Sequence, residues 1–326
     1  MAVSRLAEAA VPRPTPLDWV ARHRVLAAAL ALLVLPWLMP YQALAVNVLV
    51  YGLFAVGFNL IYGYTGLLSF GHAAFFGAGA YGAGIAIARY GVPWLPALAI
   101  GTAFAGVLGA VIGALAIRTR GIYFAMVTLA LAQCVYAVFY EWVGLTGGEN
   151  GLRGVDARPL AFLGWRIDLV DPTVKYYVLL AIVVAALWLF SRILASPFGA
   201  VLEAVRENPD RARACGYDVQ RTKWLAFVLS ALFCGLAGGL SAVHLSVVPI
   251  DSLNYTTSGL VLMMTLLGGM GTFFGPFVGA GVFVVIEDLV NLYAAHWQLV
   301  AGAIFMACVL FFPRGIWGSL LHWVRR

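Results

Sequence analysis

Residues 94–117 read WLPALAIGTAFAGVLGAVIGALAI, a run of 24 residues without a single charged side chain. An α-helix needs about 20 apolar residues to cross the hydrocarbon core of a bilayer, so this stretch predicts a membrane span. Within it, Gly109 and Gly113 form a G-x-x-x-G pair, a spacing that lets two helix backbones approach closely. A second such pair is formed by Gly235 and Gly239. We interpret both pairs as packing surfaces between helices.

Apolar runs of this kind recur along the whole chain. Of the 326 residues, 63% are apolar and only 10% are charged, whereas a soluble domain has about half and about a quarter. A disordered chain needs more charge, and a soluble enzyme would lack charged side chains to cover its surface. We therefore predict an all-α, polytopic transmembrane helical bundle of about ten spans. The other nine runs are residues 25–39, 43–62, 68–88, 122–143, 174–194, 224–248, 257–267, 274–292 and 299–312.

The basic residues between these runs predict the orientation. With the N-terminus inside, 15 of the 20 Lys and Arg residues fall in inner segments and five in outer segments. Cytoplasmic loops of membrane proteins carry an excess of Lys and Arg, so both termini are placed in the cytoplasm. The net charge of +6 then indicates contact with membrane lipid and no nucleic acid. The predicted divisions are a cytoplasmic N-terminal segment (1–24), a transmembrane domain (25–313) with a periplasmic loop (144–173) and a cytoplasmic loop (195–223), and a cytoplasmic tail (314–326).

The start of the chain has a second interpretation. Arg22 and Arg24 precede an apolar run, and Ala43-Leu44-Ala45 resembles a signal-peptidase site. Cleavage there would leave an odd number of spans and would disturb the charge bias. We therefore favour retention of residues 25–45 as a span and keep cleavage as the alternative.

The cytoplasmic loop contains signals for two short amphipathic helices. Ser196 can cap a helix that begins with Pro197, and Asn208 can cap a second helix that begins with Pro209. Gly216 can supply the left-handed residue that ends the second helix. A solvated linker has no need of paired caps and a terminating glycine. The pattern favours a docking element for a cytoplasmic partner.

Four stretches resemble the Liv-type permeases, the membrane subunits of ABC importers for branched-chain amino acids, and the long basic N-terminus resembles their M-type subunit. The cytoplasmic loop at 203–216 with KWLAFVLSA at 223–231 is similar to the family's cytoplasmic loop. YTGLLSFGHAAF at 64–75, TGGENGL at 146–152 and LGGMGT at 267–272 resemble three further family stretches. The resemblance extends over about residues 47–315.

The resemblance implies a set of partners. Such a permease lies in the bacterial inner membrane and pairs there with a second, homologous permease. It binds two cytoplasmic ABC ATPase subunits and receives its substrate from a periplasmic substrate-binding protein. A short helix, here residues 210–216, would enter a cleft of the ATPase, although Asp210-Arg211-Ala212 departs from the family's plain E-A-A form. The expected contacts in this loop are Glu203, Arg206, Asp210, Arg211, Ala212 and Gly216.

The chain itself is not expected to be an enzyme. No Gly-Lys-Ser/Thr phosphate loop occurs, so ATP would be bound and hydrolysed by the partner chains, with no cofactor here. No C-x-x-C pair exists and the five histidines are scattered. The sequence therefore predicts no catalytic residue and no metal site.

Charged groups within spans are candidates for the substrate path, because they are costly in lipid. Glu287 and Asp288, with Asn291 one turn from Glu287, could meet a substrate ammonium group. The alternative, weighed equally, is that the three residues lie near the outer membrane interface.

Uncharged polar groups at membrane depth give the remaining path candidates. Asn59 and Gln133 lie within predicted spans, and Ser69 and His72 lie near the start of another. Each could contact substrate, but hydrogen bonds between helices are the commoner use, and for His72 we favour such a structural role.

The sequence favours an importer of branched-chain or related hydrophobic amino acids, and two other function classes compete with it. A membrane enzyme would use Glu287 and Asp288 as an acid–base pair, yet neighbouring residues on a helix point about 100° apart. A channel would need rings of charge or carbonyl filters, which the sequence does not contain. Within the permease family, urea, short amides and aromatic acids remain alternative substrates.

Overall fold

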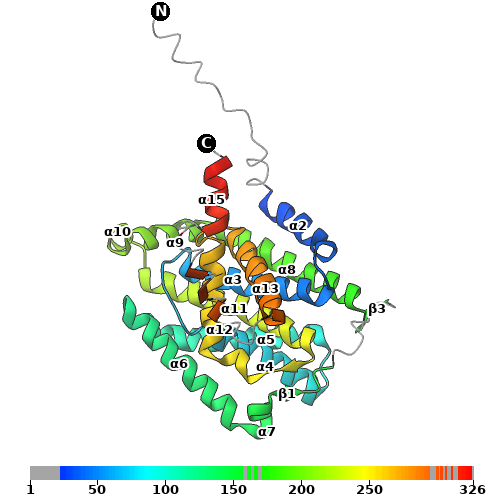
Figure 1. Ribbon diagram of the computed structural model, residues 1–326. Helices are drawn as coiled ribbons and strands as arrows, with labels where there is room; N and C mark the ends of the chain where they lie inside the picture. The colour runs from blue at the N-terminus through cyan, green and yellow to red at the C-terminus, as the bar shows by residue number, and fades with distance from the viewer. Residues whose placement is uncertain are drawn as a thin grey trace, which may run out of the picture.

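The computed structural model describes residues 23–156, 160–162, 165–167, 171–293, 299–300, 302–303, 305–306, 310 and 315–324 (Figure 1). These residues are mostly α-helical, which confirms the predicted all-α class. The long helices follow the predicted spans: α2 (Arg24–Leu38), α3 (Gln42–Tyr62), α4 (His72–Tyr90), α5 (Trp94–Ala116), α6 (Ile122–Glu141), α8 (Pro172–Ala195), α11 (Val219–Leu245), α12 (Tyr255–Gly268) and α13 (Gly275–Tyr293).

Short elements connect the long helices. The connection after α6 contains α7 (Val143–Thr146), the 3₁₀ turn η1 (Gly148–Asn150) and the strands β1 (Leu152–Arg153), β2 (Leu160–Phe162) and β3 (Trp165–Ile167). The segment predicted to be the cytoplasmic loop contains α9 (Pro197–Glu207) and α10 (Pro209–Ala214), and strand β4 (Val247–Val248) with the 3₁₀ turn η2 (Ile250–Leu253) follows α11. Strands β1 and β4 pair antiparallel, as do β2 and β3.

Within the described residues, five helices are long and apolar enough to cross a membrane, namely α3, α5, α6, α8 and α11. Residues 68–71, expected to begin a span, precede α4 instead, and α11 begins five residues before the predicted 224. The tail predicted at 314–326 includes helix α15 (Gly315–Val324), which packs against α12 and α13. Half of the tenth predicted span and nearly all of the N-terminal segment lie outside the described residues. The chain is a multi-pass membrane protein.

Helices α3, α4 and α11 form the centre of the bundle, and 14 of the 19 residues of α4 are buried. The most apolar windows of α3 and α11 are 89% and 72% buried, whereas those of α5, α6 and α8 are 39%, 22% and 33% buried. A helix that is apolar on all sides and buried by protein belongs to the core, while an apolar helix with an open face is available to lipid or to a partner. Helices α5, α6 and α8 therefore form the rim.

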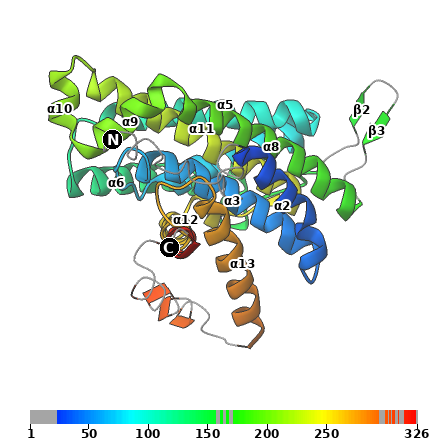
Figure 2. The same ribbon diagram turned by 90° about the horizontal axis from the view of Figure 1, so that it is seen from above.

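Helix α8 runs from one end of the bundle to the other. With 24 residues that rise 1.5 Å each, the helix is about 36 Å long. Figure 2 shows α9 and α10 at one end of α8 and strands β2 and β3 at the other. We call the end that carries α9 and α10 the coupling face. The end that carries β1, β4 and η1 is called the far face.

Helices α4, α5 and α11 are held together by direct approach of their backbones. A methyl group added at Gly79 would lie 2.0 Å from the carbonyl oxygen of Gly235, and one at Gly238 would lie 1.8 Å from that of Phe76. A methyl group at Gly109 would lie 2.3 Å from the side chain of Ala231. Such distances are too short for any side chain, which confirms that the glycine pairs are packing surfaces.

Two helices begin inside the bundle and not at its ends. The chain leaves α3 at the coupling face and returns through residues 66–71 before α4 starts at His72. From the far face, residues 246–254 return through β4 and η2 before α12 starts. The two starts meet, because the backbone N–H of Ala73 donates to the hydroxyl of Ser258 at 2.8 Å. Non-helical backbone is tolerated at membrane depth where protein surrounds it or where it borders a water-filled cavity.

We expect Gly79→Ala to destabilise the protein by about 1–3 kcal/mol, the usual cost of overpacking. Gly259→Ala is the matched control, because Gly259 also lies within a helix and has no atom within 4 Å of the added methyl group. The measurement is the midpoint of thermal aggregation in detergent. A midpoint for Gly79→Ala that equals that of Gly259→Ala would contradict the packing.

Candidate functional site

Helix α9 begins as the sequence predicts at Pro197, but its cap is different from the one expected. Ser196 occupies the capping position without a hydrogen bond from its side chain to the helix. Its hydroxyl instead donates to the carbonyl oxygen of Ile193 at 2.6 Å, in the last turn of α8. The prediction that Ser196 caps α9 is therefore wrong, because both the hydroxyl and the backbone N–H of Ser196 donate to the carbonyl oxygen of Ile193 and so close the end of α8.

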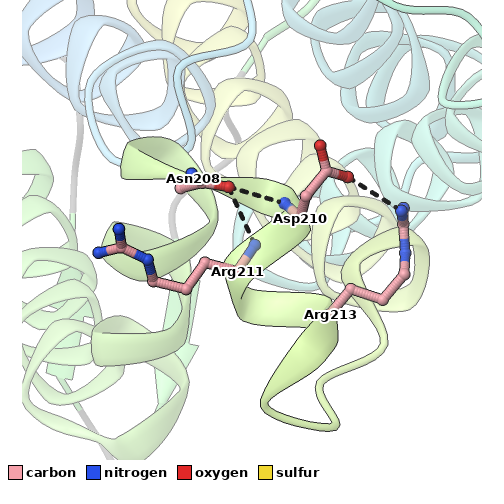
Figure 3. Close-up of polar contacts among 4 residues, drawn as sticks. All are labelled: Asn208, Asp210, Arg211 and Arg213. Atoms are coloured by element: carbon pink, nitrogen blue, oxygen red, sulfur yellow. Dashed lines mark hydrogen bonds and ion pairs between the residues drawn. The ribbon is translucent and has the colours of Figure 1, made fainter.

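Helix α10 is capped at both ends by the predicted residues, and Figure 3 shows the Asn208 cap at its start. The side-chain oxygen of Asn208 accepts from the backbone N–H groups of Asp210 and Arg211, at 3.0 and 2.9 Å. After the helix, Gly216 has φ +91°, and the N–H groups of Gly216 and Tyr217 donate back to the helix carbonyls. This double closure is a Schellman motif. The helix spans Pro209–Ala214 and is shorter than the predicted 210–216.

The side chains of α10 divide into an inner and an outer set. Ala212 is buried against Val205 of α9 and Val219 of α11 in a small separate core. Asp210 and Arg213 form an exposed ion pair at 3.1 Å, and the side chain of Arg211 points away from that pair (Figure 3). Of the residues expected to contact an ATPase, Ala212 thus faces inward. The others are exposed: Glu203, Arg206, Asp210, Arg211 and Gly216.

Arg206 connects helix α9 to the bundle. Its guanidinium donates a hydrogen bond to the carbonyl oxygen of Gly63, directly after α3. Methyl groups added at Gly66 and Gly271 would lie 3.2 and 2.8 Å from the Arg206 side chain. Three chain segments therefore meet at this one side chain on the coupling face.

Asn59 holds the glycine-rich loop between α12 and α13. Its side-chain oxygen accepts from the N–H of Gly271 at 2.9 Å, and its amide nitrogen donates to the carbonyl oxygen of Thr272 at 3.0 Å. The residue is fully buried. The amide replaces backbone partners that this loop lacks. Asn59 therefore makes hydrogen bonds within the helix bundle, which is the commoner of the two roles considered for it.

A basic pocket of about 280 Å³ separates α10 from the connection between α5 and α6. Arg118, Arg120, Arg213 and Lys223 line it, with Asp210 as the acidic member. The coupling face next to α10 is therefore strongly positive.

His72 joins three helices at the start of α4. One ring nitrogen lies 3.0 Å from the hydroxyl of Ser69, and the other lies 2.9 Å from the hydroxyl of Ser230 on α11. The Ser230 hydroxyl in turn donates to the carbonyl oxygen of Gly57 on α3, at 2.6 Å. His72 is fully buried, and both of its nitrogens are used within the protein.

Glu287, Asp288 and Asn291 lie in the last turns of α13. Tyr41, directly before α3, donates a hydrogen bond to the carboxylate of Asp288. This hydrogen bond, together with burial and the negative charge of Asp288, raises the pKa of Tyr41 to about 12. Asn291 is exposed. A hydrogen bond thus joins the end of α13 to Tyr41, the residue before α3. This contact lies away from the coupling face.

Gln133 lies on α6, and its buried amide nitrogen has no hydrogen-bond partner among the described residues. A second buried donor without a partner there is the hydroxyl of Tyr81 on α4. Asp251 of η2 lies close enough to Tyr81 for an electrostatic interaction. The sequence reasoning missed Tyr81 and Asp251, because a tyrosine in an apolar run and an acid in a short connection carry no pattern. It also missed Ser230 and Ser258, whose bonds join segments distant in sequence.

Comparisons with known proteins agree on one family. A family model described as "Branched-chain amino acid transport system / permease component" matches residues 41–309. The chain is 30% identical to the high-affinity branched-chain amino acid transport system permease protein LivM of Escherichia coli, over 88% of this chain and 73% of that protein. No solved structure matches the chain significantly.

More distant relatives include another type of subunit and another solute. The probable branched-chain amino acid transport permease protein LivH of Methanocaldococcus jannaschii is 24% identical, over 82% of this chain and 88% of that protein. The autoinducer 2 import system permease protein LsrC of Klebsiella pneumoniae is 31% identical, over 65% of this chain and 59% of that protein.

We expect Asn208→Ala to loosen α10, because loss of a helix cap costs about 0.5–2 kcal/mol. A loss of about 1 kcal/mol makes the unfolded turn about five times more populated. Trypsin should then cleave after Arg211 and Arg213 about five-fold faster, as followed by mass spectrometry of the purified permease. Asn208→Asp keeps an oxygen acceptor and should cleave at the original rate; equal rates for all three proteins would refute the cap.

Proposed function

Because the chain belongs to the permease-component family of branched-chain amino acid transport systems, we propose that it is the translocating subunit of an ATP-driven importer for branched-chain or related hydrophobic amino acids. The observation that carries the ATP-driven part is the pair of helices α9 and α10. Their outer faces are exposed, α10 is closed by a cap at each end, and α9 is joined to the bundle through Arg206. A rigid protrusion on one end of a membrane bundle is suited to receive force from a partner chain.

The coupling face is proposed to be cytoplasmic. Four cations gather in its basic pocket, and 15 of the 20 Lys and Arg residues fall on this side in a ten-span arrangement. Both termini then lie in the cytoplasm, and the far face, with the segment 144–173, is periplasmic. The membrane is proposed to be the bacterial inner membrane.

The assembly is proposed to contain a second, homologous permease, two cytoplasmic ABC ATPase subunits and a periplasmic substrate-binding protein. The open rim helices α5, α6 and α8 offer apolar surface for the second permease and for lipid. ATP would be bound by the ATPase subunits, since the sequence contains no Gly-Lys-Ser/Thr loop, and this chain would need no cofactor of its own. ATP binding would drive alternating access by moving the cytoplasmic loop.

The substrate class rests on the named relatives. LivM and LivH are named for branched-chain amino acids, whereas LsrC is named for the import of autoinducer 2. A permease of this family for urea, short amides or aromatic acids is therefore the alternative. Transport assays with each solute class would decide between them.

The polar residues at membrane depth are proposed to have different roles. Asn59, Ser69 and His72 position the helices that border the path, because their polar atoms are used within the bundle. Gln133 borders the path itself, since its amide nitrogen has no partner among the described residues. Glu287, Asp288 and Asn291 border the periplasmic end of α13.

We expect Arg211→Glu to reduce binding-protein-stimulated ATPase activity at least about ten-fold, because a charge-assisted contact with the ATPase becomes repulsive. The assay uses the complex co-purified from the adjacent genes and reconstituted in lipid. Arg221→Glu is the control, since it makes the same charge reversal on the same face beyond α10. Its exposed ion pair with Asp218 adds little stability.

Two results would contradict the proposal. A chain that purifies alone, with no ATPase partner, would refute the importer role. Equal stimulated activity in Arg211→Glu and Arg221→Glu, with the wild type active, would show that α10 is not the contact.

A further inference from the structure

The turn η2 carries an acidic residue deep into the bundle. A methyl group at Gly84 of α4 would lie 2.9 Å from Val248, and one at Gly77 would lie 2.4 Å from Leu253. The segment 248–253 therefore descends along α4, and Asp251 lies between these two contacts, at the level of the turn of α4 that holds Tyr81. Tyr81 is nine residues before the end of α4, or about 13 Å along the helix axis. Since a hydrocarbon core is about 30 Å thick, Asp251 lies well below the far-face boundary.

The carboxylate of Asp251 has no hydrogen bond or ion pair with any described residue, and the residue is exposed in the isolated chain. A carboxylate at this depth is not stable against lipid. It needs either a cation or a water-filled path beside it. The surface at Asp251 therefore faces the translocation path and not the bilayer.

Buried donors without partners lie on α4 and α6, two of the helices that η2 packs against. The side chain of Tyr81 is 0% exposed, and its hydroxyl has no partner among the described residues. The ring of Tyr81 packs against that of Phe139 on α6, with the ring centroids 5.0 Å apart. Gln133, whose amide nitrogen lacks a partner too, lies on the same helix α6, which packs against both α4 and η2. Native proteins rarely leave two such donors unpaired in one place unless a ligand or water completes them.

The three groups match the two charges of an α-amino acid. A carboxylate is the natural partner of an ammonium group, and the hydroxyl of tyrosine and the amide of glutamine donate to a carboxylate. Building on the proposed function, we propose that Asp251, Tyr81 and Gln133 form a transient binding site for the zwitterionic head of an α-amino acid within the membrane. Asp251 binds the ammonium group, and Tyr81 and Gln133 bind the carboxylate when α6 moves away from α4. The site favours amino acids over urea, amides and acids that lack an ammonium group.

The first test is uptake of radiolabelled leucine by the complete complex in proteoliposomes. We expect Asp251→Asn to lower uptake at least about ten-fold, because a charge-assisted contact is lost, while binding-protein-stimulated ATPase activity stays within about two-fold. Asp251→Glu should recover part of the uptake. The control is Asp156→Asn, which neutralises an exposed acid near the same face and should transport as the wild type does. Wild-type uptake by Asp251→Asn would overturn the site.

A second variant separates binding from folding. Tyr81→Phe removes a buried hydroxyl that has no partner, so a purely structural role predicts unchanged uptake and equal or higher thermal stability. The site predicts a KM for leucine uptake raised about five-fold at unchanged stability, and an unchanged KM would overturn it, even if Asp251→Asn fails to assemble. If the wild-type complex neither transports leucine nor responds to the binding protein, the proposed function itself fails. If it transports leucine and both variants match it, only the site fails.

Discussion

The fold depends on how a bundle surrounded by lipid satisfies its backbone. Lipid offers no hydrogen bonds, so every N–H and C=O group within the membrane must find a partner inside the protein. Helices α4 and α12 begin inside the bundle, where the first N–H groups of a helix have no intrahelical acceptor. Hydroxyl groups supply part of what is missing: Ser69 accepts from the N–H of Gly71, and Ser258 accepts from that of Ala73. The glycine contacts between α4 and α11 also bring His72 within 2.9 Å of the hydroxyl of Ser230.

This constraint also explains which parts of the fold the sequence predicts. Span positions follow from runs of about 20 apolar residues, and the ends of α10 follow from local capping rules at Asn208 and Gly216. These features depend on neighbours in the sequence. The inward return of residues 246–254 depends on tertiary packing against Gly77 and Gly84 of α4. A short connection with one acid and one proline carries no local signal for that path.

The same distinction applies to the candidate site. Polar residues within apolar runs, such as Asn59 and His72, are visible in the sequence, but their partners are not. The partner of His72 on α11 is 158 residues away, and Asn59 holds a loop 212 residues away. Only the fold shows that these residues are satisfied and that Gln133 and Tyr81 are not. In a lipid environment the unsatisfied groups are the more informative ones, because their cost must be offset by something that the chain alone does not provide.

Helix α3 connects the coupling face with the proposed site at Asp251. Arg206 of α9 binds the carbonyl oxygen of Gly63, one turn after Asn59, which holds the loop between α12 and α13. Packed helices move as units, because their interiors are too dense to deform locally. A displacement of α9 therefore acts on the end of α3 and, through Asn59, on the end of α12. Helix α12 begins directly after η2, which carries Asp251. Movement at the coupling face and the charge beside the path are thus connected by two hydrogen-bonded contacts and one short helix.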